Sequence, residues 1–252
     1  MACIAIVLHG HLPFVRHPEQ PFYWEEHWLF EAIAGCYLPL LNALNRLKSE
    51  NVPYRITLSL TPPLIYMLQD TLLRLRFEGY LEQRIELACR ECRRTRYLPA
   101  LYKLAKHYEE VFSRCLHDFT QTYCRDVIGA FSALQRSGHV EIMASCATHG
   151  FLPYLQINPT SVCAQVKLGV EVYRRTFGCS PRGFWLPECG YNSGMEKTLA
   201  DAGIDYFIVD THGIAHASPR ARYGPYQNVR CANGVGVFGR DPESSHQVWS
   251  AQ

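Results

Sequence analysis

The sequence contains no long hydrophobic run. Of its 252 residues 48% are hydrophobic, yet no segment approaches the roughly 20 consecutive apolar residues that a membrane helix requires. The apolar run from Cys3 to Leu8 is short, lacks a basic start and leads directly into His9-Gly10-His11. It therefore predicts a β-strand and not a signal peptide. We expect a soluble protein with no membrane partner.

The sequence also lacks a large excess of charge of either sign. The formal net charge is +2 and 19% of the residues are charged, which gives no basic face for nucleic acid. The arginine-rich stretch 90–96 is interrupted by Glu91 and is typical of a solvated helix surface. We expect no nucleic-acid partner.

Closely spaced pairs of cysteines are scarce, although the sequence has 11 cysteines. Cys89 and Cys92 form a close pair, and no second pair completes a zinc site with them. The odd number of cysteines in a chain of this length favours reduced thiols. We therefore expect a cytoplasmic location.

Short apolar runs recur along the chain and are mostly separated by segments of helical periodicity. This alternation predicts a parallel sheet with right-handed crossovers. Between residues 64 and 137 only helical periodicity is found, so we expect one barrel domain over 1–252 with an inserted helical subdomain. The expected strands are 3–8, 55–60, 140–144, 182–186, 206–209 and 235–238, and the expected helices are 28–48, 64–79, 81–94, 101–119, 127–134, 159–177 and 195–202.

Polar and titratable residues follow the expected strands, at the point where each strand ends. In α/β barrels the carboxyl ends of the strands meet at one face, and the active site forms there. The repetition of this pattern at every strand is much harder to explain by core packing than any one residue is. The residues are His9, His11, Thr61, His149, Glu188, Asp210, His212, Arg240 and Asp241.

Glu188 is the strongest catalytic candidate. It lies in the segment 183–191, where an apolar run ends in Pro187 and a single carboxylate among aromatic residues and glycines. Since proline cannot donate a hydrogen bond to a sheet, the strand is expected to end there and to present Glu188. The alternative is a solvated glutamate in a loop.

A carboxylate near several histidines and aromatic rings is typical of a sugar-binding cleft. Glycoside chemistry requires two carboxylates, and Asp210 and Asp241 are candidates for the second. The histidines would bind sugar hydroxyls, as would Arg240. The rings that could stack on a sugar are Trp185, Tyr191, Phe14 and Trp24.

A metal site is the competing interpretation, and it would make the protein a metal-dependent carbohydrate deacetylase. His9, His11, His149, His212 and Asp210 are ligand types that zinc accepts. However, no Asp-Asp pair and no His-x-x-x-His motif accompanies them. We favour the glycosidase interpretation, and we expect neither a metal nor another cofactor.

Four spaced motifs resemble glycoside hydrolase family 57, and in particular its α-1,4-glucan branching enzymes. They are His9-Gly10-His11-Leu12-Pro13, the segment from Val140-Glu141-Ile142 to Thr148-His149-Gly150, the segment 183–191, and Asp210-Thr211-His212; the segment from Gly239 to Ser250 is similar as well. The resemblance implies a (β/α)7 barrel and a retaining mechanism on an α-glucan such as glycogen. It also implies that Glu188 is the nucleophile, with His11 and His149 as substrate-binding neighbours.

One departure from this family affects the expected activity. Its acid/base aspartate lies in a later motif than any present here, and six strands leave a seven-stranded barrel unclosed. We therefore expect an incomplete barrel, which either has little turnover as a fragment or is completed by a separate polypeptide. The remaining alternatives are an amylase-like enzyme, a 4-α-glucanotransferase, and a glucan-binding fragment without catalysis.

Overall fold

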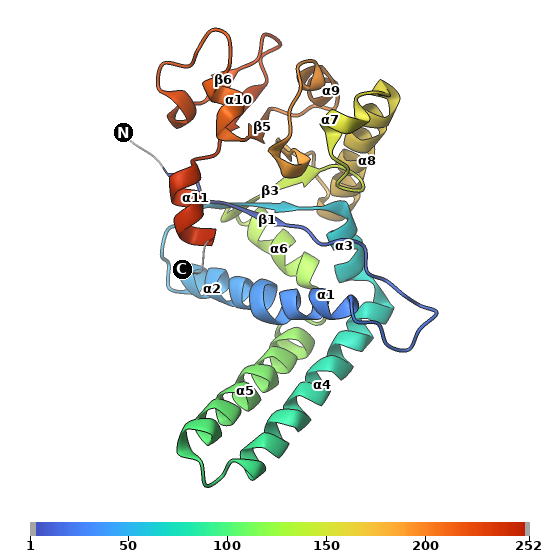
Figure 1. The fold of residues 1–252 in the computed structure, drawn as a ribbon, viewed down its shortest axis with the longest axis vertical. Helices are drawn as coiled ribbons and strands as arrows, with labels where there is room; N and C mark the ends of the chain where they lie inside the picture. Colours follow the sequence, from blue (N-terminus) through green and yellow to red (C-terminus); the bar gives the residue numbers. More distant parts are fainter. Residues whose placement is uncertain (1–3, 250–252) are drawn as a thin grey trace. The chain divides into compact units, whose positions relative to one another are not determined.

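A computed structural model describes residues 4–249. The chain forms two compact units (Figure 1). The first contains Met1–His11, Ile56–Pro63 and Glu141–Gln252, and the second contains Leu12–Arg55 and Leu64–Val140. None of the helices between residues 4 and 249 combines the length and apolarity needed to span a bilayer.

The first unit is built on a seven-stranded sheet in the order β1-β2-β3-β4-β5-β7-β6. The first five strands lie in the order of the chain, as in a barrel. The pairs β1–β2, β3–β4, β4–β5 and β5–β7 are parallel, and β6 pairs antiparallel with β7. Among the described residues β1 and β6 are the free edges. The strands are β1 Val7–Gly10, β2 Ile56–Leu60, β3 Val140–Ser145, β4 Gly183–Trp185, β5 Tyr206–Val209, β6 Val229–Arg230 and β7 Gly236–Gly239.

The predicted fold class, an α/β barrel-type sheet that is not closed, is confirmed. All six predicted strands are present, one of them, Tyr206–Val209, with the predicted bounds and the others with shifted bounds; Cys3, the start of the first one, lies outside the described residues. The prediction missed β6, because its two residues lie in a loop rich in proline, glycine and arginine and carry no apolar run.

The register of the sheet separates two faces. His9 pairs with Ser59, and Ser145 pairs with Trp185. Since side chains alternate along a strand and paired residues share a face, these four lie on one face near the carboxyl ends. The opposite face carries the apolar side chains of Leu58, Phe184 and Phe207, which are at most 3% exposed.

Short helices and turns follow the strands of this unit. Asn158 caps α8 by accepting from the Thr160 N–H at 3.1 Å, with Pro159 at the first helical position. The elements are α7 Leu152–Leu155, α8 Pro159–Phe177, the 3₁₀ turn η3 Pro187–Cys189, α9 Met195–Asp201, α10 Thr211–Ala215, the 3₁₀ turn η4 Gly224–Tyr226 and α11 Pro242–Trp249.

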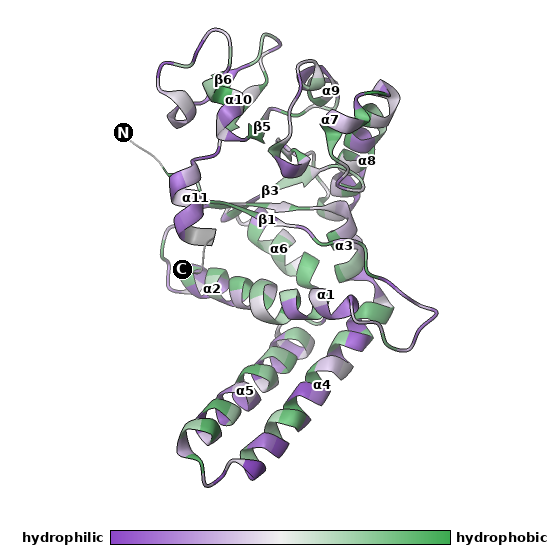
Figure 2. Ribbon diagram, viewed as in Figure 1, coloured by the Kyte–Doolittle hydropathy of each residue, from purple (hydrophilic) through white to green (hydrophobic). Residues whose placement is uncertain are grey.

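The second unit is helical. Its helices α4 and α5 lie side by side as an antiparallel pair (Figure 1), and each carries alternating hydrophobic and hydrophilic residues (Figure 2). The helical elements between Glu26 and Arg136 are α1 Glu26–Ala32, the π-helical segment η1 Ile33–Tyr37, α2 Leu38–Ser49, α3 Pro62–Gln69, α4 Thr71–Arg94, α5 Pro99–His117, the π-helical segment η2 Asp118–Thr122 and α6 Val127–Arg136.

Helix boundaries differ from the prediction at several places. The expected break between residues 79 and 81 is absent, because α4 is continuous from Thr71 to Arg94, and two further differences have a local cause. The expected helix 64–79 is divided at Asp70, whose backbone is extended and whose carboxylate accepts from the Leu73 N–H at 3.0 Å. The expected helix 28–48 contains η1 directly before Pro39, which lacks an N–H and would clash with the carbonyl four residues earlier. A widened π turn relieves this conflict, and apolar periodicity does not detect it.

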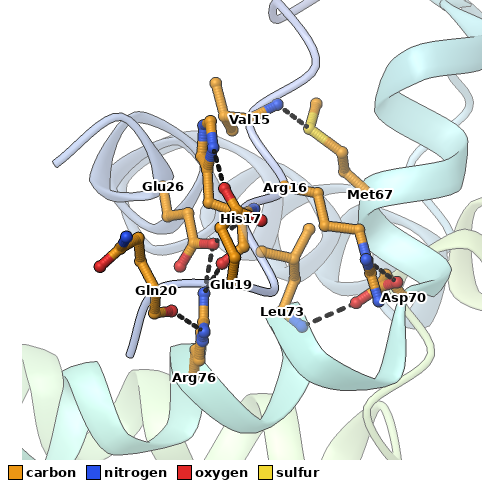
Figure 3. A network of polar contacts seen from close by, with 10 residues as sticks. All are labelled: Val15, Arg16, His17, Glu19, Gln20, Glu26, Met67, Asp70, Leu73 and Arg76. Carbon is orange, nitrogen blue, oxygen red and sulfur yellow. Dashed lines mark hydrogen bonds and ion pairs between the residues drawn. The ribbon is translucent and has the colours of Figure 1, made fainter. Parts of the chain in front are cut away.

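A buried ion pair joins the first residue of α1 to α4 (Figure 3). Glu26 is 1% exposed, and its carboxylate accepts from Arg76 at 2.5 Å and from the His17 N–H at 3.2 Å. Arg76 also donates to the backbone carbonyls of His17 and Gln20. The guanidinium therefore satisfies several acceptors at once.

We predict that Arg76→Ala destabilises the protein by about 3–5 kcal/mol, because it leaves the Glu26 carboxylate buried without a cation. The matched control is Arg94→Ala on the same helix, since Arg94 forms an exposed ion pair with Glu91 and such pairs contribute little. Urea unfolding measures both variants. Equal destabilisation by the two substitutions would contradict the importance of the buried pair.

Candidate active site

A stack of four aromatic rings covers the polar face of the sheet. The ring of Trp185 lies 4.4 Å from that of His9, His9 lies 5.0 Å from His149, and His149 lies 3.9 Å from His11. Their interplanar angles are 12°, 24° and 27°. The structure thus brings together four of the residues that the sequence analysis selected from three separate strand ends.

Two buried hydroxyls contact this stack from the strand ends. Thr61 is fully buried, and its hydroxyl lies 3.1 Å from His11 Nδ1. Ser145 is also fully buried, and its hydroxyl lies 3.2 Å from His149 Nδ1. Thr61 is among the residues predicted from the sequence, whereas Ser145, the last residue of β3, is not, because a strand-end serine carries no distinctive pattern.

Glu188 lies on the tight turn η3 that ends β4. Its backbone is left-handed, with φ 52° and ψ 23°, and Cys189 follows with φ 54°. Such conformations cost about 1–3 kcal/mol each for residues other than glycine and cluster at functional sites. The turn is held by two hydrogen bonds, Cys189 N–H to the Leu186 carbonyl at 2.9 Å and Gly190 N–H to the Pro187 carbonyl at 3.0 Å.

Packing below Glu188 keeps this turn in place. Cys189 is 3% exposed and packs with Met143, Trp185 and Ile208. A Cβ atom at Gly190 would lie 2.3 Å from the ring of Phe151, so only glycine allows the approach. Glu188 itself is exposed, and its carboxylate is therefore presented to solvent by a buried and strained support.

The cysteine beside Glu188 is not a competing nucleophile. Burial raises the pKa of the Cys189 thiol to about 11, although Arg240 acts in the opposite direction through a hydrogen bond and its charge. The charges of Asp210 and Glu188 raise it further. Cys189 is therefore a neutral thiol at pH 7, and the electrostatic influence of Arg240 and Asp210 places both near the turn.

The two candidates for a second catalytic carboxylate have structural roles. Asp210 caps α10 by accepting from the Thr211 N–H at 2.8 Å. Asp241 accepts from the Ser244 hydroxyl at 2.5 Å and caps the start of α11. Hydrogen bonds from Ser244 hold the pKa of Asp241 below its usual range, so this carboxylate is poorly suited to donate a proton.

His212 and three of the four expected ring platforms are not part of the stack. The His212 side chain is 76% exposed, and its contact is Asp210 at 3.9 Å. Tyr191 packs its ring on Phe207 at 5.4 Å and donates its hydroxyl to Glu196 at 2.8 Å, which makes it a structural residue. Phe14 belongs to the second compact unit, as does Trp24.

The histidines of the stack are arranged as stacked rings and not as a ligand set. Stacking directs the nitrogen lone pairs along the ring planes, so they do not converge on a point. Among residues 4–249 no group of three or more histidine, cysteine, aspartate or glutamate side chains is placed to hold a metal ion. The geometry gives no support to the metal-site interpretation.

Enclosure of the stack keeps its histidines uncharged. Desolvation lowers the pKa of His9 to about 3, and the positive charges that His149, His11 and Arg240 can carry lower it further. Desolvation also lowers the pKa of His149 to about 4. The pKa of His11 is lowered by desolvation, while nearby Glu188 acts in the opposite direction.

These shifts predict acid lability of the fold. A histidine whose pKa is about 6.5 unfolded and about 4 folded binds a proton only in the unfolded chain between those values, so stability is full above pH 6.5 and falls toward pH 4. In the wild type the free energy of unfolding should fall as the pH is lowered from 7 to 4. In His149→Gln it should fall less steeply over the same range. Urea unfolding from pH 7 to 4 measures this slope, and parallel slopes would contradict it.

Comparisons with known proteins identify the relatives of this chain. The 1,4-alpha-glucan branching enzyme of Thermococcus kodakarensis is 34% identical to this chain. The alignment covers 98% of this chain and 40% of that enzyme. The crystal structure of the alpha-amylase AmyC of Thermotoga maritima superposes with a TM-score of 0.92 at 43% identity, over 98% of this chain and 47% of AmyC.

A second solved structure, the GH57-type branching enzyme of Pyrococcus horikoshii, matches with a TM-score of 0.82 at 33% identity, over 97% of this chain and 48% of that enzyme. The chain thus spans less than half the length of these relatives. The family model for glycosyl hydrolase family 57 matches residues 5–248, which confirms the resemblance drawn from the motifs. The chain belongs to glycosyl hydrolase family 57.

Proposed function

We propose that this protein acts on α-glucans by a retaining mechanism, with Glu188 as the nucleophile. The observation that carries the proposal is the left-handed, strained turn that presents the Glu188 carboxylate beside a stack of neutral histidines. A nucleophile must be fixed relative to the sugar carbon that it attacks, and a turn supported by buried Cys189 supplies that rigidity.

The histidines are suited to bind a neutral polyhydroxylated ligand. An uncharged imidazole carries one donor and one acceptor, as a sugar hydroxyl does. In this proposal His9, His11, His149 and Trp185 bind the sugar next to the scissile bond. Arg240 and Asp210, near the Glu188 turn, contact neighbouring hydroxyls, and His212 and Asp241 remain weaker candidates for binding.

The branching reaction is the favoured activity. It transfers the sugar from a glycosyl ester of Glu188 to the 6-hydroxyl of a second glucan and forms an α-1,6 linkage. Two of the relatives described above are named as branching enzymes. A role in glycogen synthesis in the cytoplasm is part of this proposal, since the cysteine content favours reduced thiols.

An amylase-like hydrolase is the second candidate. It is favoured by the 43% identity to the enzyme named alpha-amylase AmyC. The two activities differ in whether water or a sugar hydroxyl attacks the ester, and this choice depends on how well loops exclude water from the site. The segment from Ile214 to Asn233, which contains the end of α10, η4 and β6 joined by loops, is the candidate for that role.

We predict that 5-fluoro-α-D-glucosyl fluoride labels Glu188. Fluoride leaves without protonation, so the test depends on the nucleophile and not on an acid. Mass spectrometry of proteolytic fragments should find the added sugar on the fragment containing Glu188. The label should be lost in Glu188→Gln and retained in Glu243→Gln, which alters an exposed glutamate of α11. A chain that stays unlabelled yet is retarded by glycogen in an affinity gel would instead be a glucan-binding protein without catalysis.

We predict further that replacing Tyr223 and Tyr226 together by alanine diverts the glycosyl ester to water. These rings are 60% and 72% exposed in the segment from Ile214 to Asn233, where they can cover a bound sugar. With α-maltosyl fluoride as donor and amylose as acceptor, the wild type should form α-1,6 linkages, and the double variant should release several-fold more free maltose. Tyr97→Ala is the control, since Tyr97 is 78% exposed in the second compact unit. Free maltose as the main wild-type product would favour the amylase-like reaction.

A further inference from the structure

Ser145 connects His149 to the backbone of the strand that carries Glu188. Its hydroxyl donates to the carbonyl of Trp185 at 2.9 Å and lies 3.2 Å from His149 Nδ1. Both contacts are shielded from solvent, because Ser145 is 0% exposed. The Ser145 side chain is therefore positioned to determine which ring nitrogen of His149 carries the proton.

The number of protons available decides the direction of the second hydrogen bond. A carbonyl oxygen can only accept, so the single proton of the Ser145 hydroxyl is used by Trp185. The same oxygen can then act toward His149 only as an acceptor. His149 must donate from Nδ1, and the neutral ring carries its proton on that nitrogen.

The other nitrogen of His149 is consequently a bare acceptor. Nε2 is buried and has no hydrogen-bond partner among the described residues. The indole Nε1 of Trp185, which can only donate, is also buried without a partner. An unsatisfied buried polar atom costs about 1–3 kcal/mol, and a hydroxyl that donates to Nε2 would remove that cost.

The segment carrying His149 is held rigidly against α8. The Ala147 N–H donates to the Gln165 carbonyl at 3.0 Å, and the Gln165 side chain bonds Thr148 twice, at 3.0 and 2.8 Å. A Cβ atom at Gly169 would lie 2.0 Å from the Ser145 carbonyl oxygen. The backbones of α8 and of the end of β3 are therefore in direct contact, and these contacts fix the distance from Ser145 to His149.

We propose that Ser145 is a positioning residue that fixes His149 as the Nδ1–H tautomer, so that Nε2 accepts a hydrogen bond from a hydroxyl of the bound sugar. The tautomer is a property of this chain alone. Its use toward a sugar rests on the proposed action on α-glucans, and the two parts are tested separately.

The first test reads the tautomer directly. Long-range ¹H–¹⁵N correlation of the histidine-labelled protein at pH 7 distinguishes a protonated ring nitrogen from a bare one, and His149→Gln assigns the signals. The wild type should show a protonated Nδ1 and a bare Nε2. In Ser145→Ala the Nδ1 proton loses its acceptor, so the proton should move to Nε2.

The matched control is Ser59→Ala. Ser59 lies on the same face of the sheet in the neighbouring strand β2, is fully buried, and has a hydroxyl without a partner among the described residues. Its removal should leave the His149 tautomer unchanged. A wild type with the proton on Nε2 would overturn the proposal, and so would a Ser145→Ala protein with unchanged His149 signals.

The second test adds maltotetraose to the same samples. An accepted hydrogen bond should move the Nε2 signal of His149 upfield in the wild type, and Ser145→Ala should bind maltotetraose about tenfold more weakly, as expected for one lost hydrogen bond. If the tautomer responds as expected but maltotetraose moves no histidine signal, the glucan site is wrong while the role of Ser145 stands. Unchanged affinity in Ser145→Ala would overturn the use of the tautomer in binding.

Discussion

The parallel register of the sheet is the constraint on which the candidate site depends. Pairing of His9 with Ser59, and of Ser145 with Trp185, puts polar side chains from four strands on one face. Shifting one strand by a single residue would replace them by the apolar residues of the opposite face. The site is therefore a consequence of strand pairing, and the loops add Glu188 and His149 to a layer that the strands have already built.

The parallel arrangement of the strands also explains how much of the site could be predicted from the sequence. Short apolar runs locate the strands, and the convergence of their carboxyl ends predicts that His9, His149 and Glu188 lie near one another. Local chemistry that has no periodic signature could not be predicted. Asp70 ends a helix by accepting one backbone hydrogen bond, and β6 exists because β7 is present to pair with it.

The positions of the carboxylates at the strand ends could be predicted from the sequence, but their individual roles could not. Asp210 and Asp241 follow strands just as Glu188 does, yet both cap short helices, whereas the Glu188 side chain has no such use. Residue type contributes to this distinction, because aspartate is a preferred N-cap residue and glutamate is not, and the backbone adds a left-handed conformation at Glu188, with φ 52°. A sequence gives the order of residues but does not reveal a left-handed glutamate.

The charge state of the ring stack argues for the chemical class of its ligand. A cluster of protonated histidines would attract phosphate or carboxylate groups, but the pKa values of His9 and His149 are lowered to about 3 and about 4. At neutral pH these rings offer only paired donors and acceptors. Two of their polar atoms, His149 Nε2 and Trp185 Nε1, are buried without a partner, and an apolar ligand would leave both unsatisfied. A neutral ligand rich in hydroxyl groups meets both conditions, since each hydroxyl can donate to one atom and accept from the other.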